Sequence, residues 1–267
     1  MESATLTPMR SPSGRIEVAL VALLLALAAA AWVATGDRMS GMDAGPGTDL
    51  GGLGWFVVAW VLMMAAMMLP SLAPVVLAHA RIEAGHPGAR RIRPPGATAA
   101  FVAGYLGAWT LAGLLGYLVV EGVRSLDAGF LAWDEAGPYV AGGVILSAAL
   151  YELTAAKEAF LSRCRSPRTL AGRWRPGGLG ALRMGIEHGG LCVGCCWALM
   201  AALFALGVMS NGWMVFVAAL IAAEKLLPWQ RIPSQGIAIL LVALGIAVAF
   251  APEEVPGLTI PGMGMEE

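Results

Sequence analysis

The chain is organised around the stretch His188-Gly189-Gly190-Leu191-Cys192-Val193-Gly194-Cys195-Cys196-Trp197, which lies inside an apolar segment over about 180–209. This stretch holds three of the four cysteines in the chain. In an α-helix, residues three and four positions apart share a face. His188, Cys192 and Cys195 are therefore predicted to lie on one stripe of a helix.

Sulfur and imidazole groups on one stripe favour a soft metal ion. Met184 lies one turn before the stripe, and Cys196 is slightly rotated from it. Thiolates, imidazole and a thioether suit Cu(I), and the set suits Zn(II) if the thioether is left out. The competing interpretation is packing, because free Cys often behaves as a small buried hydrophobe. Three cysteines and a histidine on adjoining turns favour metal or redox chemistry.

Composition predicts the fold class. The 267 residues are 58% hydrophobic and 13% charged, whereas about a quarter of the residues in a soluble protein are charged. Apolar runs of about 20 residues recur, each long enough to cross a hydrocarbon layer of about 30 Å. We therefore predict an all-α, polytopic transmembrane helical bundle. The net charge of −1 and the lack of a basic patch with interleaved aromatic residues argue against a nucleic-acid partner.

Seven membrane-spanning helices are predicted within a transmembrane domain over 16–250. Their approximate ranges are 16–35, 55–78, 97–120, 138–161, 180–209, 213–229 and 237–250. Residues 1–15 are predicted to form a disordered cytoplasmic N-terminus, and residues 251–267 a flexible outer tail rich in Met, Pro and Gly. The first apolar run is longer than the core of a signal peptide, about 7–15 residues, so we expect it to be retained.

The basic residues predict the orientation of the chain in the cell membrane. With a cytoplasmic N-terminus and seven spans, all but two of the 17 Lys and Arg residues fall on the inner side. The exceptions are Arg38 and Arg124. This positive-inside bias places the C-terminus outside. His79 and His86 fall in the inner polar segment over 79–95, where we expect both to be solvated.

A second sulfur cluster falls in the predicted span over 55–78. Met63, Met64, Met67 and Met68 lie within about 140° of arc on a helix. By their distance from the predicted membrane edge, they reach the same depth as the cysteines. They are either copper ligands or plastic packing material, and the sequence leaves both interpretations open.

The sulfur clusters together predict one central site and an outer collecting site. We expect Cu(I) between the second and fifth spans, held by Cys192 with Cys195 or Cys196, and with His188 or a Met completing the shell. Met39 and Met42, in a Gly-rich loop over 36–54, are predicted to collect the ion outside, because neutral thioethers bind Cu(I) where thiols would be oxidised.

Charged residues inside the predicted spans have two interpretations, functional or structural. Glu152 and Glu224 are expected to pair with Lys157, Lys225 or Arg183, and Arg183 is also a candidate to balance excess thiolate charge. Small residues in the span over 97–120, beginning with Gly104, are expected to allow close helix packing.

Several motifs together resemble one known family. They include Met63-Met64-Ala65-Ala66-Met67-Met68-Leu69-Pro70, Cys164-Arg165-Ser166-Pro167, Trp174-Arg175-Pro176-Gly177, Cys192-Val193-Gly194-Cys195-Cys196-Trp197 and Glu224-Lys225-Leu226-Leu227-Pro228-Trp229. The chain resembles, over about 55–249, the predicted metal-binding integral membrane proteins called domain of unknown function 2182, often labelled copper chaperones. Members usually carry a second Cys and a Pro where this chain has 151–161. That departure argues against a metal site at Cys164.

Three functional hypotheses follow. The first is a non-enzymatic copper-binding membrane protein that acquires Cu(I) and delivers it to a client protein or membrane complex, with zinc as the alternative metal. The second is a membrane thiol–disulfide oxidoreductase using Cys192 and Cys195, although the chain has no second cysteine pair in an outer loop to relay electrons. The third is a structural subunit or a small-solute transporter, although no internal repeat supports a transporter.

Overall fold

The structure is a computed structural model that describes residues 14–39, 50–85, 94–125, 135–208, 210–227, 231–256 and 258. Regular structure in these residues is helical throughout, which confirms the predicted all-α class. The helices are α1 (Gly14–Met39), α2 (Leu53–Gly85), α3 (Pro94–Ser125), α4 (Gly137–Glu152), α5 (Ala155–Arg165), α6 (Pro167–Ala171), α7 (Gly177–Leu206), α8 (Asn211–Leu226) and α9 (Arg231–Phe250), followed by the short 3-10 helix η3 (Pro252–Glu254).

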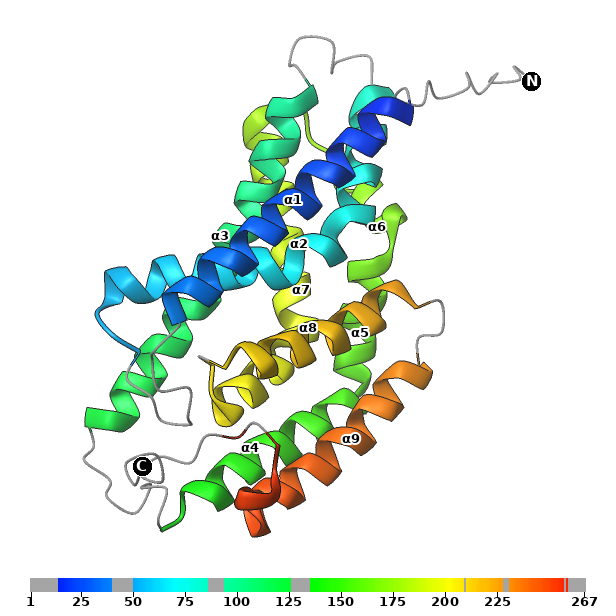
Figure 1. The fold of residues 1–267 in the computed structure, drawn as a ribbon. Coiled ribbons are helices and arrows are strands. Elements are labelled where there is room, and N and C mark those ends of the chain that lie inside the picture. The colour runs from blue at the N-terminus through cyan, green and yellow to red at the C-terminus, as the bar shows by residue number, and fades with distance from the viewer. Residues whose placement is uncertain are drawn as a thin grey trace.

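Helix α7, which carries the cysteine stretch, is the centre of the bundle. Helices α3, α4, α5 and α8 all pack against it. Helix α1 lies along α2, and α4 runs beside α9 on the far side of the molecule, as Figure 1 shows. The cysteine stretch is therefore enclosed by several helices that are distant from it in sequence.

Several helices meet the length and hydropathy of a membrane span. Five do so alone: α1, α2, α3, α7 and α9, over the residues described. Helices α4 and α5 together make a sixth if the bent pair counts as one span. The predicted sixth span corresponds to α8, which has 16 residues and so a length of about 24 Å. These helices support a membrane protein, and the seven-span count stays a prediction.

The closest approach between α3 and α7 depends on glycine. A Cβ placed on Gly104 would collide with the carbonyl oxygen of Leu182, and one on Gly185 with the carbonyl oxygen of Phe101. Small residues at both positions let the two backbones come together, which confirms the packing role expected of Gly104. This contact places Tyr105, the residue after Gly104, against the cysteine face of α7.

The predicted fourth span is broken into two helices. Helices α4 and α5 are bent by 66°, although the break contains no proline. Thr154 caps α5 by accepting a hydrogen bond from the backbone N–H of Lys157 at 3.2 Å, as Thr commonly does at a helix start. The bend turns α5 against α7.

Two sequence predictions about loops are wrong. Residues 36–39, assigned to the Gly-rich loop, continue α1, so that Met39 is the buried last residue of a helix. His79 does not lie in a solvated loop, because α2 extends to Gly85 and buries the histidine completely. Met42 and His86 lie outside the described residues.

Candidate metal centre

Three cysteine thiols from two helices meet in the interior. Cys164 comes from α5, and Cys192 and Cys195 come from α7. Their sulfur atoms all lie within 4.8 Å of one another. Three sulfurs that bind one metal ion at about 2.3 Å in a trigonal plane lie about 4.0 Å from one another. Side-chain movements of less than about 1 Å would therefore bring this cysteine trio together on one soft metal ion.

The trio is buried, and its cysteines are free thiols. Cys192 and Cys195 are completely buried, Cys164 is 4% exposed, and all three are free thiols. The thiol of Cys195 donates to the carbonyl oxygen of Cys192 at 3.2 Å. Because no disulfide joins these cysteines, their sulfur atoms remain available to an ion.

A lysine provides positive charge beside the trio. The Lys225 ammonium group on α8 donates to the Cys192 sulfur at 2.9 Å, and the Tyr105 hydroxyl lies 3.0 Å from the same sulfur. Both contacts favour the thiolate form of Cys192, because hydrogen bonding to a charged form stabilises it. Lys225, and not Arg183, is thus the cation beside the cysteines, because Arg183 lies exposed and pairs with Glu187 at 3.2 Å.

Two further predicted ligands border the trio. The Nε2 atom of His188 lies 3.8 Å from the Cys164 sulfur, and the Cys196 sulfur lies 3.3 Å from that of Cys195. Met184 is buried one turn before His188, as the helical stripe predicted. Imidazole and a fourth sulfur are thus within a small side-chain movement of the three thiols.

A small cavity of about 50 Å³ opens beside the trio. Its lining includes Ser71 and Val75 of α2, Tyr105 of α3, and His188, Cys164 and Lys225. Five helices therefore contribute to one space, and of the trio Cys164 lines it. A single ion in this space would lie beside the Cys164 side chain.

One of the four α2 methionines, Met68, contacts the lysine that lies beside the cysteine trio. Met63, Met64, Met67 and Met68 are all buried, at 3% exposure or less. The Met68 sulfur lies 3.8 Å from the Lys225 ammonium, which also contacts Cys192. Met68 and Cys192 thus share Lys225 as a neighbour. Ligation of copper by the four methionines stays a prediction.

The structure places Cys164 with Cys192 and Cys195, although the departure from the family pattern over 151–161 argued against a metal site there. Cys164 follows the predicted span over 138–161, but it belongs to α5 and its side chain packs inside. The break between α4 and α5 directs it toward α7. The sequence signal that could have found it is the spacing of Lys157, Leu161 and Cys164, which places the three on one face of α5.

A second charged cluster lies behind the metal centre. The ammonium group of Lys157 contacts both carboxylate oxygens of Glu152 at 2.6 Å and one of Glu224 at 2.8 Å. Ser234 donates to the other Glu224 oxygen at 2.8 Å. This ion triad confirms the structural pairing expected of both glutamates, with Lys157 rather than Lys225 or Arg183 as the cation.

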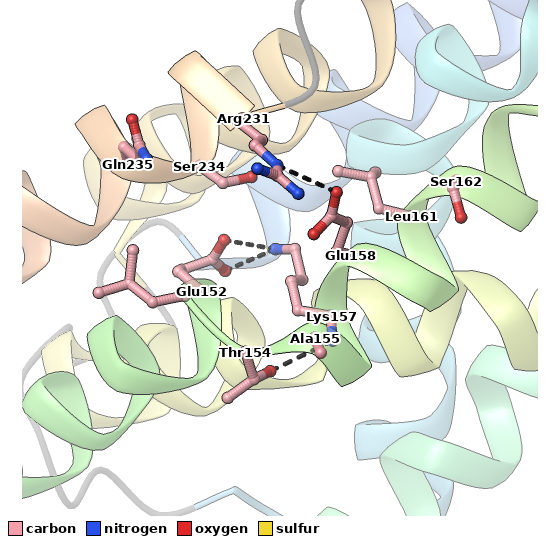
Figure 2. A pocket seen from close by; sticks show the side chains of 11 residues that line it. Glu152, Thr154, Ala155, Lys157, Glu158, Leu161, Ser162, Arg231, Ser234 and Gln235 are labelled. Carbon is pink, nitrogen blue, oxygen red and sulfur yellow. Dashed lines mark hydrogen bonds and ion pairs between the residues drawn. The ribbon is translucent and has the colours of Figure 1, made fainter.

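The ion triad borders a separate pocket of about 320 Å³, shown in Figure 2. Glu152 and Lys157 point toward each other from either side of the break between α4 and α5, while Glu158 pairs with Arg231 of α9. The polar groups that the figure draws are largely paired with one another. We therefore interpret the ion triad as a structural support for the broken span.

Comparison with known families identifies the chain. The family described as PpoB2, copper chaperone, matches residues 57–248. The match spans most of the chain and includes every residue of the cysteine trio. No match is found among curated proteins, and none among solved structures. The chain belongs to this copper chaperone family.

Proposed function

We propose that this member of the copper chaperone family binds Cu(I) at the cysteine trio and hands the ion to a copper-accepting client protein or membrane complex. The observation that carries the proposal is the meeting of three buried, free thiols within 4.8 Å. Thiolate sulfur is a soft ligand that selects Cu(I) or Zn(II), and the family description favours copper.

Charge supports a monovalent ion. A bare cation in an apolar interior is very costly unless it is paired. Two thiolates carry two negative charges, and one Cu(I) together with the Lys225 ammonium balances them. The third cysteine can then remain a thiol or exchange with its neighbour as the ion moves. Ligand exchange of this kind delivers an ion without chemical conversion of a substrate.

Copper competition under reducing conditions tests the proposal. The full-length protein in detergent micelles, with a thiol-free reductant, is loaded with Cu(I) and titrated with the chelator bathocuproine disulfonate. The variant C164S/C192S/C195S should lose tight binding, because hydroxyl groups are poor ligands for Cu(I). Cys196→Ser should retain it, since the trio remains complete. Wild-type copper affinity in the folded triple variant would reject the proposal.

The same samples separate the alternatives. A zinc protein would bind Zn(II) at the trio and show no preference for Cu(I) in competition. An oxidoreductase would carry a stable Cys192–Cys195 disulfide that exchanges electrons with a quinone. We expect instead reduced thiols that Cu(I) protects from alkylation.

The orientation is a further part of the proposal. Its support is the positive-inside distribution of Lys and Arg, with seven spans placing the C-terminus outside. An activity reporter fused after Glu267 should be active only outside the cytoplasm. Cytoplasmic activity of an inserted fusion would indicate an even number of spans.

A further inference from the structure

Two polar side chains near the end of α2 are buried without full partners. His79 is completely buried, and neither ring nitrogen has a hydrogen-bond partner among the described residues. Glu83, one turn later, is 3% exposed, and its Oε1 atom is also unpaired. An unsatisfied buried polar group costs about 1–3 kcal/mol. The coincidence of two such groups on adjacent turns therefore needs a physical cause.

The surroundings hold both side chains in place. The ring of His79 stacks on Phe101 with centroids 4.8 Å apart. The other oxygen of Glu83, Oε2, accepts a hydrogen bond from the indole N–H of Trp174 at 3.0 Å. Arg81, between them in sequence, is instead exposed and pairs with Glu17 of α1 at 2.7 Å. His79 and Glu83 thus face inward, on the side of α2 opposite to its charged contact.

This pair is next to the metal centre. Val75, one turn before His79 on the same face of α2, lines the cavity that reaches Cys164 and His188. Phe101, which stacks on His79, also contacts the His188 ring with centroids 6.0 Å apart. The two imidazoles therefore border one phenyl ring. Val75, His79 and Glu83 follow one another at intervals of one turn on the same face of α2, and Val75 lines the cavity.

We propose that His79 and Glu83 form a second copper-binding position, in series with the cysteine trio, through which Cu(I) enters or leaves the trio. This inference rests on the proposed function for the identity of the ion. Imidazole nitrogen is a copper ligand, and the Glu83 carboxylate supplies the one negative charge that balances Cu(I). One bound ion would give a partner to one ring nitrogen of His79 and to the Oε1 atom of Glu83. The site lacks thiolates, so it binds more weakly than the trio, as a transit position requires.

The test counts copper in two backgrounds with Cu(I) as the only probe. In full-length C164S/C192S/C195S protein in detergent micelles, one copper bound by nitrogen and oxygen should remain, as read by X-ray absorption. Adding His79→Leu or Glu83→Gln should remove that ion. In the chain with native cysteines, the same substitutions should lower the copper content by one equivalent while the sulfur-bound ion stays.

Thr35→Val is the matched control. Thr35 on α1 is 1% exposed and its hydroxyl is also unpaired, so the substitution removes a buried orphan polar group elsewhere. It should leave both copper equivalents bound. Unchanged copper content in His79→Leu and Glu83→Gln with native cysteines would overturn the second position and leave the cysteine trio standing. Loss of the sulfur-bound ion in the triple variant tests the proposed function separately.

Discussion

Lys157 and Lys225 both place an ammonium group inside the helical bundle, but oxygen surrounds the first and sulfur contacts the second. Lys157 contacts the carboxylates of Glu152 and Glu224 at 2.6–2.8 Å. Lys225 contacts the Cys192 sulfur at 2.9 Å and the Met68 sulfur at 3.8 Å. The two clusters diverge at adjacent positions on α8, since Glu224 supports the ion triad and Lys225 the cysteine trio.

The two clusters differ in whether their ligand atoms remain available to bind an ion. In the ion triad, Lys157 and Ser234 already contact all four carboxylate oxygens of Glu152 and Glu224, so the cluster stabilises the broken span. In the cysteine trio, Cys192 contacts a lysine and a tyrosine, and Cys164 lines a small cavity. Thiolate sulfur is a soft ligand that suits Cu(I). The same cation type therefore supports stability at one position, and at the other it lies beside the site where we propose that the ion binds.

The largest expected effect comes from breaking the ion triad. Lys157→Met would leave two buried carboxylates without their cation. Removing one partner of a buried ion pair typically costs about 3–5 kcal/mol, so we expect a large fall in the thermal unfolding temperature in detergent micelles. Copper affinity of the fraction that folds should be unchanged, because Lys157 belongs to the other cluster.

Arg231→Gln is the control for this prediction. It removes the ion pair with Glu158 at the same pocket, where both side chains are exposed. Exposed pairs contribute little, so the unfolding temperature should stay near that of the wild type. Equal loss of stability in both variants would contradict the structural role of the ion triad.

Lys225→Met should mainly lower the copper affinity, whereas Lys157→Met should mainly lower the stability. A hydrogen bond to a charged group contributes about 1.5–3 kcal/mol, so Cu(I) affinity at neutral pH should fall roughly tenfold to a hundredfold. Protons compete with the metal for thiolates, and the lysine favours the thiolate. The deficit should therefore shrink as pH rises. Chelator competition at several pH values measures it, and a deficit that is independent of pH would contradict this mechanism.

Gly185→Ala should lower both the stability and the copper affinity, because Gly185 lies on the helix that carries Cys192 and Cys195. The added methyl group collides with the backbone of α3 at Phe101, and overpacking of this kind costs about 1–3 kcal/mol. Separation of α3 from α7 should also move Tyr105 away from Cys192. We expect a lower unfolding temperature together with weaker copper binding.

Gly107→Ala is the matched control on α3. A Cβ at Gly107 meets no atom within 4 Å, and Ala in a helix interior is about 0.5–1 kcal/mol better than Gly. Stability should therefore rise slightly and copper binding should not change. A loss of stability at Gly107 equal to that at Gly185 would show that the close approach of α3 and α7 is not the cause.

Hydropathy and periodicity predict most of this fold, because each apolar run has to form a helix when no water can satisfy its backbone. They also predict that Met184, His188, Cys192 and Cys195 share a buried face of α7. The break at Thr154 was missed because a cap, and not a proline, ends the continuous pattern. That break directs Cys164 toward α7, so the spacing of Lys157, Leu161 and Cys164 indicates a shared face of α5 but not the helix that this face contacts.

The charged members of the site were harder to predict for a related reason. Glu224 and Lys225 are neighbours in sequence, and only the packing of α8 between two clusters separates their partners. His79 lies two residues before the exposed Arg81, and α2 extends past the boundary expected from the sequence. In such a polar segment, the sequence does not distinguish the inward face of the helix from the outward one. Each of these errors concerns contacts between helices that are distant in sequence.

The smallest expected effect separates two tyrosines that both contact α7. The hydroxyl of Tyr105 lies 3.0 Å from the Cys192 sulfur, whereas that of Tyr151 donates to the Gly194 carbonyl oxygen at 2.6 Å. A typical hydrogen bond contributes about 0.5–1.5 kcal/mol, so Tyr105→Phe should weaken Cu(I) binding by about fivefold. Tyr151→Phe removes a bond of similar strength from a backbone acceptor, and it should lower stability while copper affinity stays unchanged. Chelator competition and thermal unfolding of the two variants, measured side by side, test this difference. If both tyrosines changed copper affinity equally, the effect would come from the general packing of α7, because only Tyr105 contacts a sulfur of the trio.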